Sequence, residues 1–321
     1  MNRFGWAYIG CGGIARTTAK ELVQTEDNHI VAVWNRTKSK AEEFAKEFGG
    51  TVYDTAEEAI NAVGVEGVYV NVTGDKHAEY TLSSIKNKKP VLCEKPFTVN
   101  AEKTKEIFDY AKENNTYVSE AMWTWHNDTA LQVKDWVLSG AVGEVKDVEC
   151  VFMVPLLKHG DIPRLTRPDM LGGALMDLGV YAIRYCYELF GNPDSIHCVG
   201  DVREVDYSET ITFQYPDFKA TLRISMIEEG EHFFEVKGSK GSILIPEFHM
   251  SKQALLKTDQ EKTFEMEGLL YGTQFSNVAA EIRAEKKEGE KISAKSTIDV
   301  MALMDECRKQ MGLVFPEEMV E

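Results

Sequence analysis

The stretch Gly10-Cys11-Gly12-Gly13-Ile14-Ala15 decides the fold of this chain, because it follows the apolar run Phe4–Ile9 and opens a helical pattern. In this G-x-G-x-x-A arrangement, Gly10 permits a tight turn, Gly12 lets the backbone approach a ligand, and the small Ala15 lets helix pack on strand. A strand, a glycine turn and a helix N-terminus in this order bind pyrophosphate in dinucleotide-binding folds. The alternative is a glycine-rich turn that only connects two elements.

The composition is that of a packed globular protein. The 321 residues are 43% hydrophobic and 27% charged, and this length suits two domains. No apolar stretch approaches the ~18 residues needed to cross a bilayer, so we expect a cytoplasmic protein. The formal charge of −16 disfavours nucleic acid and anionic membranes as partners. The six cysteines are scattered without a C-x-x-C pair, which argues against a metal site and against a disulfide framework.

Short apolar runs and helical patterns alternate in the first part of the chain, which predicts a parallel sheet with helices on both faces. The apolar runs are Phe4–Ile9, His29–Trp34, Gly67–Val72, Pro90–Cys93 and Thr116–Ser119. The helical patterns include Ser39–Phe48, His77–Lys86 and Ala101–Glu113. We therefore expect an α/β domain over residues 1–122.

Closely spaced strand patterns dominate the rest of the chain, which indicates antiparallel pairing and an α+β domain over residues 123–321. The expected strands are Val145–Val154, Ile196–Val202, Thr210–Tyr215, Ala220–Met226, His232–Val236 and Ser242–Ile245. The expected helices are Thr129–Leu138, Gly173–Phe190, Gln274–Lys286 and Thr297–Met311.

A charged pair follows the short apolar run that ends at Cys93. Glu94 and Lys95 should emerge at the carboxyl end of a buried parallel strand, where open sheets of this type bind their ligands. Pro96 stiffens the backbone of Lys95 and is compatible with a cis bond. We predict that Lys95 is catalytic; the alternative is a surface ion pair at a strand end.

The run from Gly172 to Tyr181 supplies a second polar pair. Asp177 and Tyr181 are four residues apart, so they share one face of the predicted helix. That face is otherwise apolar, so the Asp177 carboxylate either caps a local group or faces a polar ligand. Tyr181 is suited to donate a proton to a carbonyl, and a nearby Lys95 ammonium lowers a phenol pKa. Packing is the alternative role for a helical tyrosine.

The chain resembles the glucose–fructose oxidoreductase/inositol dehydrogenase (Gfo/Idh/MocA) family over essentially its whole length. The resemblance rests on the glycine turn, Glu94-Lys95-Pro96, the Gly-Gly-x-x-x-Asp-x-Gly-x-Tyr run, His77–Tyr80 and Gly238–Ser242. The segment Glu120–Trp125, together with Tyr181, looks closest to the dimeric trans-dihydrodiol dehydrogenase branch. Many members of the family carry histidine in place of Tyr181, and that branch usually has arginine where Trp125 stands.

The resemblance implies an N-terminal Rossmann domain and a C-terminal domain with an open, mostly antiparallel sheet, which often forms the interface of a homodimer or homotetramer. It also implies NAD(P)-dependent redox chemistry on a sugar, polyol or diol. Position by position, Lys95 resembles the catalytic lysine, and Asp177 and Tyr181 resemble the substrate-side polar pair. Thr73 and His77, with Glu94, are expected near the nicotinamide, although a histidine at a helix start is as often structural.

The residues after the second strand indicate which nicotinamide is used. Asn35 lies about 20 positions after Ala15, where NAD enzymes place Asp or Glu on the adenosine ribose. The chain instead has an amide followed by Arg36, which can pair with a 2′-phosphate. We therefore expect NADP(H) in preference to NAD(H). The alternative is that Arg36 is an ordinary turn cation stacking on adenine.

These observations lead to one functional hypothesis: a dehydrogenase or reductase of a secondary alcohol/ketone pair, in which Lys95 and Tyr181 converge on the reacting carbon. Trp123 and Trp125 are expected either to line the substrate pocket or to pack in the core. Arg167 either binds an anionic substrate group or is solvated. Two other classes stay open, a glycosidase that redox-cycles its NAD and a non-catalytic dinucleotide sensor.

Overall fold

The computed structural model describes residues 3–319, which form two compact units. Unit 1 consists of Met1–Thr98, Glu102–His126 and Gly268–Ile298. Unit 2 consists of Val99–Ala101, Asn127–Glu267 and Asp299–Glu321. The expected domain ranges, 1–122 and 123–321, divide the chain at a single point, and they stay a prediction. Both compact units, in contrast, consist of several separate segments of the sequence.

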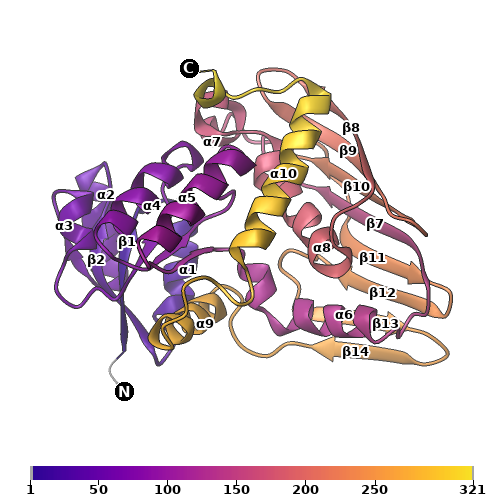
Figure 1. Ribbon diagram of the computed structural model, residues 1–321, viewed down its shortest axis with the longest axis horizontal. Coiled ribbons are helices and arrows are strands. Elements are labelled where there is room, and N and C mark those ends of the chain that lie inside the picture. The colour runs from indigo at the N-terminus through magenta and orange to yellow at the C-terminus, as the bar shows by residue number, and fades with distance from the viewer. Residues whose placement is uncertain (1–2, 320–321) are drawn as a thin grey trace. The chain divides into compact units, whose positions relative to one another are not determined.

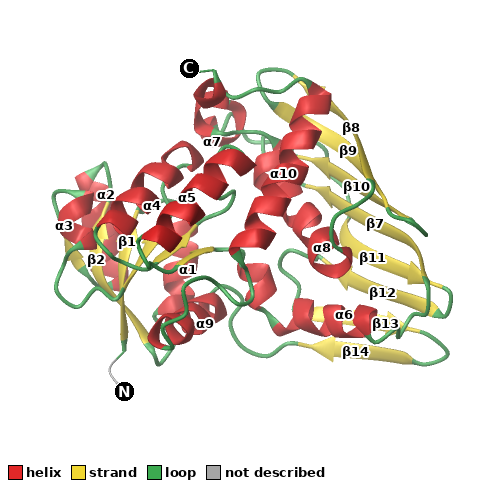
Figure 2. Ribbon diagram, viewed as in Figure 1, coloured by secondary structure: helices red, strands yellow, loops and turns green. Residues whose placement is uncertain are grey.

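Unit 1 is built on a parallel sheet, sheet A, with the strand order β3-β2-β1-β4-β5-β6 in the described residues (Figures 1 and 2). The strands are β1 (Phe4–Ile9), β2 (Asn28–Trp34), β3 (Thr51–Val52), β4 (Gly67–Val70), β5 (Val91–Cys93) and β6 (Val118–Glu120). The helices and turns are α1 (Gly13–Leu22), α2 (Lys38–Phe48), α3 (Ala56–Ile60), η1 (Gly74–Lys76), α4 (His77–Lys86), α5 (Ala101–Glu113), η2 (Trp123–His126) and α9 (Gly272–Arg283). This strand order is that of the Rossmann fold.

Both faces of sheet A are buried, as a parallel sheet requires. All six residues of β1 are buried, and their side chains alternate between two cores. Phe4, Trp6 and Tyr8 pack with α1, α2 and α9, whereas Ala7 and Ile9 pack with α3, α4 and α5. The apolar run at the start of the chain therefore forms the central strand of a three-layer unit.

The segment Gly268–Ile298 completes the core of unit 1, although it follows the whole second sheet in sequence. The Phe275 ring on α9 is fully buried, with its centroid 5.3 Å from that of Trp6 and 5.0 Å from that of Tyr69. The Thr297 hydroxyl donates to Glu120 Oε2 at 3.2 Å, which ties the end of this segment to β6.

Unit 2 is built on a mostly antiparallel sheet, sheet B, with the order β14-β13-β12-β11-β7-β10-β9-β8 in the described residues. Only β7 and β10 pair in parallel within it. Its strands are β7 (Val145–Met153), β8 (Ser195–Val202), β9 (Asp206–Gln214), β10 (Lys219–Ser225), β11 (His232–Gly238), β12 (Gly241–Pro246), β13 (Gln253–Lys257) and β14 (Glu261–Glu265). Its helical segments are α6 (Asp128–Leu138), α7 (Pro163–Thr166), η3 (Pro168–Met170), the π-helical turn η4 (Leu175–Gly179), α8 (Val180–Phe190), η5 (Pro316–Glu318) and the later part of α10 (Ala294–Met311).

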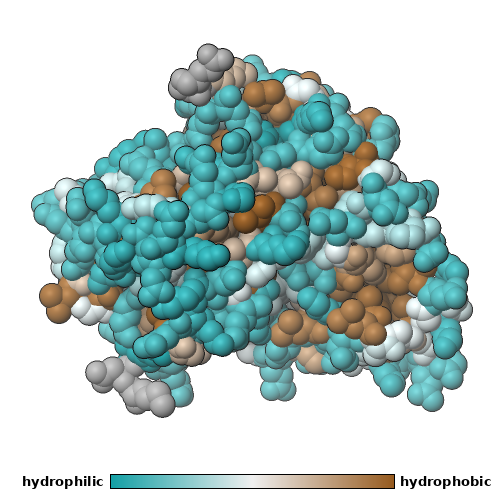
Figure 3. Space-filling model, in the orientation of Figure 1, coloured by the Kyte–Doolittle hydropathy of each residue, from teal (hydrophilic) through white to brown (hydrophobic). Residues whose placement is uncertain are grey.

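The two faces of sheet B differ in burial. The helices α6, α8 and α10 lie over one face of sheet B (Figure 1). Phe234 lies on the face that α8 covers, with its ring centroid 5.2 Å from that of Tyr185, and both Phe234 and Ile243 are fully buried. On the opposite face, the register aligns Glu235, Leu244 and Leu255 in one row, and all three are only half-buried. The sheet is therefore open on one side. Apolar side chains also gather at the surface around α6 (Figure 3), where Leu138 is 71% exposed.

The predicted fold class is confirmed, a parallel Rossmann unit with an α+β unit whose sheet is open and mostly antiparallel. Periodicity did not predict β3 and α3, which span two and five residues and are too short to show a period. It also did not predict β13 and the edge strand β14, whose ends are polar. The helix predicted over Gly173–Phe190 exists, but Leu175–Gly179 within it is π-helical. No helix in the described part of the chain is long and apolar enough to cross a membrane.

Replacing Phe275 by alanine should lower the free energy of unfolding by about 3–5 kcal/mol, because the change removes a buried ring from the core of unit 1. Urea unfolding followed by circular dichroism measures the change. Val63, which is 97% exposed, gives the matched control in Val63→Ala, for which no change is expected. An equally small change for Phe275→Ala would contradict the assignment of α9 to this core.

Candidate active site

Gly10 makes the turn at the carboxyl end of β1 in a conformation that other residues rarely adopt. Its φ is +115°, and a Cβ at this position would lie 2.8 Å from the backbone carbonyl and the side-chain oxygen of Asn71. The Gly10 N–H donates to the carbonyl of Trp34 at 2.9 Å. Both the backbone conformation and the close approach of Asn71 therefore require glycine here.

Gly12 and Gly13 leave the start of α1 open. A Cβ on either residue would meet no protein atom within 4 Å, so packing within the protein does not explain these glycines. The helix begins at Gly13 with no side-chain cap and no acidic residue in its first turn. Its first N–H groups and the positive end of its dipole suit a phosphate. Ala15, by contrast, is fully buried against the sheet, and these residues together fit a dinucleotide pyrophosphate.

Asn35 holds the glycine turn to the loop that follows β2. Its Oδ1 accepts the N–H of Cys11 at 3.1 Å, and its Nδ2 donates to the carbonyl of Thr37 at 3.0 Å. The adjacent Arg36 is exposed and forms no ion pair with any described residue, whereas Lys38 is paired with Asp54 at 2.5 Å. Arg36 is therefore the cation at this loop that remains available to a ligand.

Two aromatic side chains lie beside this loop. The rings of Trp34 and Tyr80 are 5.2 Å apart at their centroids. Burial raises the pKa of Tyr80, and the positive charge of Arg36 opposes that rise, which places the guanidinium near the phenol. An arginine next to an aromatic pair is suited to bind an adenine ring and an adjacent phosphate.

Glu94 and Lys95 lie at the carboxyl end of β5, as predicted. Glu94 is 4% exposed, its Oε1 accepts the Tyr69 hydroxyl at 2.5 Å, and its Oε2 accepts the backbone N–H of Lys95 at 3.2 Å. Burial raises the pKa of Glu94 to about 7, against the lowering effects of the Tyr69 hydrogen bond and the Lys95 charge. The Lys95–Pro96 bond is cis, and Lys95 is half-buried. The hydrogen bond from the Lys95 N–H to the buried Glu94 carboxyl group holds the backbone of Lys95 at the end of β5.

His77 connects the loops that follow β4 and β5. Its Nδ1 lies 2.8 Å from the carbonyl oxygen of Pro96, and its Nε2 lies 3.2 Å from that of Val72. Burial lowers the pKa of this imidazole, so the neutral ring donates to one of the two carbonyls. Through these two contacts, His77 holds the Lys95–Pro96 segment close to the loop that follows β4. Thr73, which precedes η1, is exposed at the same end of the sheet.

In unit 2, the π-helical turn η4 carries Asp177 and leads directly into α8 with Tyr181. Asp177 Oδ1 accepts Arg164 Nη1 at 3.1 Å, so this carboxylate already has a cationic partner. Tyr181 is 7% exposed, and its ring centroid lies 6.0 Å from that of His249 and 6.4 Å from that of Phe152. Sequence reasoning did not predict His249, because it follows β12 without a motif. π-Helical turns occur frequently at functional sites.

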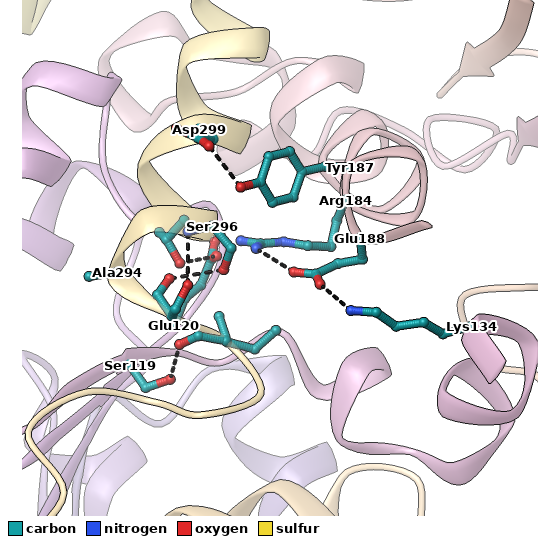
Figure 4. A network of polar contacts seen from close by, with 12 residues as sticks. Ser119, Glu120, Lys134, Arg184, Tyr187, Glu188, Ala294, Ser296 and Asp299 are labelled. Carbon is teal, nitrogen blue, oxygen red and sulfur yellow. Dashed lines mark hydrogen bonds and ion pairs between the residues drawn. The ribbon is translucent and has the colours of Figure 1, made fainter. Parts of the chain in front are cut away.

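A polar network fixes the helix that bears Tyr181 (Figure 4). Arg184 is fully buried and lies 3.4 Å from Glu188, which in turn pairs with Lys134 of α6 at 3.1 Å. The Tyr187 hydroxyl donates to Asp299 of α10 at 2.7 Å. These contacts hold α8 to two neighbouring helices of unit 2. They give Tyr181 a rigid backbone, which a positioned proton donor needs.

The residues predicted to line the substrate pocket have different environments. Trp123 and Trp125 in η2 are 1% and 2% exposed, and the Trp123 ring packs on Tyr271 at 4.3 Å. Their burial favours the core-packing role over a pocket wall. Arg167 is exposed and pairs with Asp169 two residues later.

Profiles of known families identify both parts of the chain. The profile described as the oxidoreductase family with an NAD-binding Rossmann fold matches residues 4–122, and that of the GFO/IDH/MocA C-terminal domain matches residues 130–244. The chain belongs to the Gfo/Idh/MocA family. It is an NAD(P)-dependent dehydrogenase of that family, as the sequence motifs predicted.

Curated relatives match over nearly their full length. The trans-1,2-dihydrobenzene-1,2-diol dehydrogenase of Xenopus tropicalis is 26% identical, covering 97% of this chain and 99% of the relative. The NADP(+)-linked scyllo-inositol 2-dehydrogenase IolU of Bacillus subtilis (strain 168) is 27% identical, covering 99% of both chains. The first of these supports the predicted dihydrodiol dehydrogenase branch.

Solved structures share the fold. The 3-ketoreductase KijD10 of Actinomadura kijaniata, in complex with NADP and TDP-benzene, superimposes with a TM-score of 0.85 at 23% identity, covering 97% of this chain and 98% of that one. The aldose-aldose oxidoreductase of Caulobacter crescentus gives a TM-score of 0.87 at 19% identity, covering 96% and 97%.

The buried Glu94 should make stability depend on pH. Because its folded pKa is about 7 against an ordinary value of 4.5, the folded state binds the proton more tightly than the unfolded chain. The resulting stabilisation is fully present below the unfolded value and is lost as the pH rises through about 7, with a size of about 3 kcal/mol. Urea unfolding at pH 4.5 to 8.5 should show a smaller decrease for Glu94→Gln than for the wild type. Glu42→Gln, on the exposed face of α2, is the control; identical slopes for all three proteins would refute the assignment.

Proposed function

We propose that this protein is an NADP-dependent oxidoreductase that transfers a hydride between the nicotinamide and a secondary alcohol/ketone of a sugar, polyol or cyclic diol. The curated relatives act, by their names, on a dihydrodiol and on an inositol. The structural neighbours include a ketoreductase and an aldose-aldose oxidoreductase. Each of these names describes an oxidation or reduction of an oxygen-bearing small molecule.

One observation carries the proposal: the carboxyl ends of two strands of the parallel sheet A, β1 and β5, present the open glycine turn and Lys95 at the same edge of the sheet. β1 leads into Gly12 and Gly13, where a phosphate fits, and β5 leads into Glu94 and Lys95. Only β4 lies between these two strands. A cation at this edge supports a role for Lys95 at the nicotinamide end of a dinucleotide that lies across the switch point.

A bound nicotinamide supplies the hydride in reduction and accepts it in oxidation. In the reducing direction, the Tyr181 hydroxyl donates its proton to the substrate oxygen as negative charge develops there. The Lys95 ammonium stabilises that charge and favours the tyrosinate that remains. Asp177, which Arg164 holds in place, accepts a hydrogen bond from a neighbouring substrate hydroxyl. In this proposal, Lys95 and Tyr181 act on the same substrate oxygen.

We also propose that the protein is a cytoplasmic homo-oligomer. The half-buried row of Glu235, Leu244 and Leu255 on the open face of sheet B supports an interface between copies, because it mixes apolar and charged side chains. The cysteines of the described residues are all free and buried. Free thiols are the usual state in a reducing compartment.

Preference for NADP should depend on Arg36. Arg36→Ala should raise the KM for NADPH about 10- to 100-fold, the effect of losing a charge-assisted hydrogen bond, and leave the KM for NADH unchanged. Initial rates at varied cofactor concentration, followed as absorbance at 340 nm, measure both constants. Lys46→Ala at the end of α2 is the matched control. A wild type that clearly prefers NADH would refute the NADP assignment.

Catalysis should depend on Lys95 and Tyr181 together. With the most active member of a panel of sugars, inositols, osones and dihydrodiols, Lys95→Met should lower kcat about 100- to 1,000-fold, because it removes charge stabilisation. Tyr181→Phe should lower kcat about 100- to 10,000-fold, because it removes the proton donor. Lys86→Met, an exposed position on α4, is the control. Fluorescence titration should show that both variants still bind NADPH; unchanged turnover in either variant would refute its role.

A further inference from the structure

Two acidic side chains are buried together in unit 2, beneath the turn that precedes α8. Asp206 is the first residue of β9 and is fully buried, and Glu209 on the same strand is 3% exposed. Their side chains lie within hydrogen-bonding reach of each other. No residue of the predicted site lies on β9, and the proposed reaction uses neither acid.

Asp206 holds the start of the helical segment that contains Asp177. Its Oδ2 accepts the backbone N–H of Leu175, the first residue of the π-helical turn η4, at 2.6 Å. A carboxylate at this end of a helix also interacts favourably with the helix dipole. Asp206 therefore acts as a cap that is supplied by a strand 31 residues further along the chain.

The two acids also explain two glycines of the Gly172–Tyr181 motif. A Cβ on Gly173, whose φ is +120°, would lie 2.1 Å from Asp206 Oδ1. A Cβ on Gly179 would lie 3.1 Å from Glu209 Oε1. One carboxyl group thus fills the space beside the start of the turn, and the other lies beside its end. Gly173 is therefore required for the fit between the turn and Asp206, and Gly179 lets Glu209 approach the end of the turn closely.

The pair lacks the partners that two carboxylates would need. Neither acid forms an ion pair with any described residue. If both carboxyl groups are ionised and can only accept hydrogen bonds, three of their oxygen atoms have no partner: Glu209 Oε1, Glu209 Oε2 and Asp206 Oδ1. The other titratable groups facing Glu209 are the thiols of Cys198 on β8 and Cys307 on α10. The nearby Arg203 is exposed and pairs with Asp201. Two adjacent buried anions without a cation would be strongly unfavourable.

We infer that Asp206 and Glu209 share one proton, and that this pair positions the π-helical turn on which Asp177 and the start of the Tyr181 helix depend. The proton resides on Glu209, which donates to Asp206, while Asp206 remains the acceptor for Leu175. Burial and the negative charge of Asp206 both raise the pKa of Glu209 well above its ordinary value, in agreement with this arrangement. The catalytic part of the inference rests on the proposed function.

Loss of the shared proton should release the turn. At alkaline pH, the two carboxylates repel each other beneath Gly173 and Gly179, and the cap at Leu175 is weakened. Asp206 and Glu209 are positioning residues, because they act on the substrate-side groups through the backbone of the turn. Their removal should affect substrate binding and the alkaline side of the pH profile, and leave cofactor binding in unit 1 unchanged.

The test compares kcat/KM from pH 6 to pH 10 for the wild type, Glu209→Gln and Asp206→Asn, with NADPH and the most active member of the substrate panel. Glu204→Gln, an exposed glutamate two positions before Asp206, is the matched control. Glu209→Gln keeps a donor toward Asp206 at every pH, so it should retain neutral activity and show a smaller alkaline decrease than the wild type, because only the part that comes from loss of the Tyr181 proton remains. Asp206→Asn should raise the substrate KM about tenfold, the effect of losing a charge-assisted hydrogen bond, with an unchanged Kd for NADPH.

A Glu209→Gln profile that superimposes on that of the wild type overturns the inference, as does an unchanged substrate KM in Asp206→Asn. If Asp206→Asn does not fold, the Glu209→Gln profile decides. If the wild type turns over no member of the panel, the proposed function is contradicted, but the shared proton is not. The pH dependence of urea unfolding then tests the shared proton. The free energy of unfolding should then decrease above pH 4.5 more steeply in the wild type than in Glu209→Gln, because the folded wild type keeps a proton on Glu209 that the unfolded chain releases. Equal pH dependence of the unfolding free energy in the wild type and in Glu209→Gln would contradict the inference that the two acids share a proton.

Discussion

A Cβ on Gly12 or Gly13 would meet no described atom within 4 Å, so the space at the start of α1 is open, and the chemistry of unit 1 depends on this constraint. Gly12 and Gly13 leave that space open, whereas Gly10 makes the turn that directs the chain into it. The turn is held from two sides, by the carbonyl of Trp34 and by the side chain of Asn35. A rigid strand on one side and a rigid helix on the other keep the phosphate-binding groups in place before any ligand arrives.

Buried ionisable groups recur around the regions that we assign to function. Glu94 lies under the Lys95 segment, His77 supports it, and the Asp206–Glu209 pair lies under the turn with Asp177. Each of these groups costs stability when it is desolvated, since burial disfavours its charged form. The residues with this unfavourable desolvation energy are the ones that hold backbone segments at defined positions. In both units, polar side chains thus fix loops that apolar packing alone would leave adjustable.

The sequence was sufficient for the fold class and for the residues of the glycine turn, because both follow from local patterns. Lys95 was also predictable, since the carboxyl end of a short apolar strand defines a place in a parallel sheet. The π-helical form of Leu175–Gly179 was not, because it depends on acids that lie 30 or so residues away in sequence and contact the turn only in the fold. For the same reason the sequence left the tryptophans undecided: the burial of Trp123 depends on Tyr271. Contacts between distant segments carry no periodic signal.

The return of Gly268–Ile298 to unit 1 has a consequence for biosynthesis. During translation, the first 126 residues are made long before Phe275. The Trp6 and Tyr69 rings therefore lack their packing partner during that time. The nascent N-terminal unit therefore exposes an aromatic surface for as long as the ribosome takes to make the intervening sheet. At typical elongation rates of about 5–20 residues per second, that interval lasts several seconds or more. Such a surface is the kind that chaperones shield on unfinished chains.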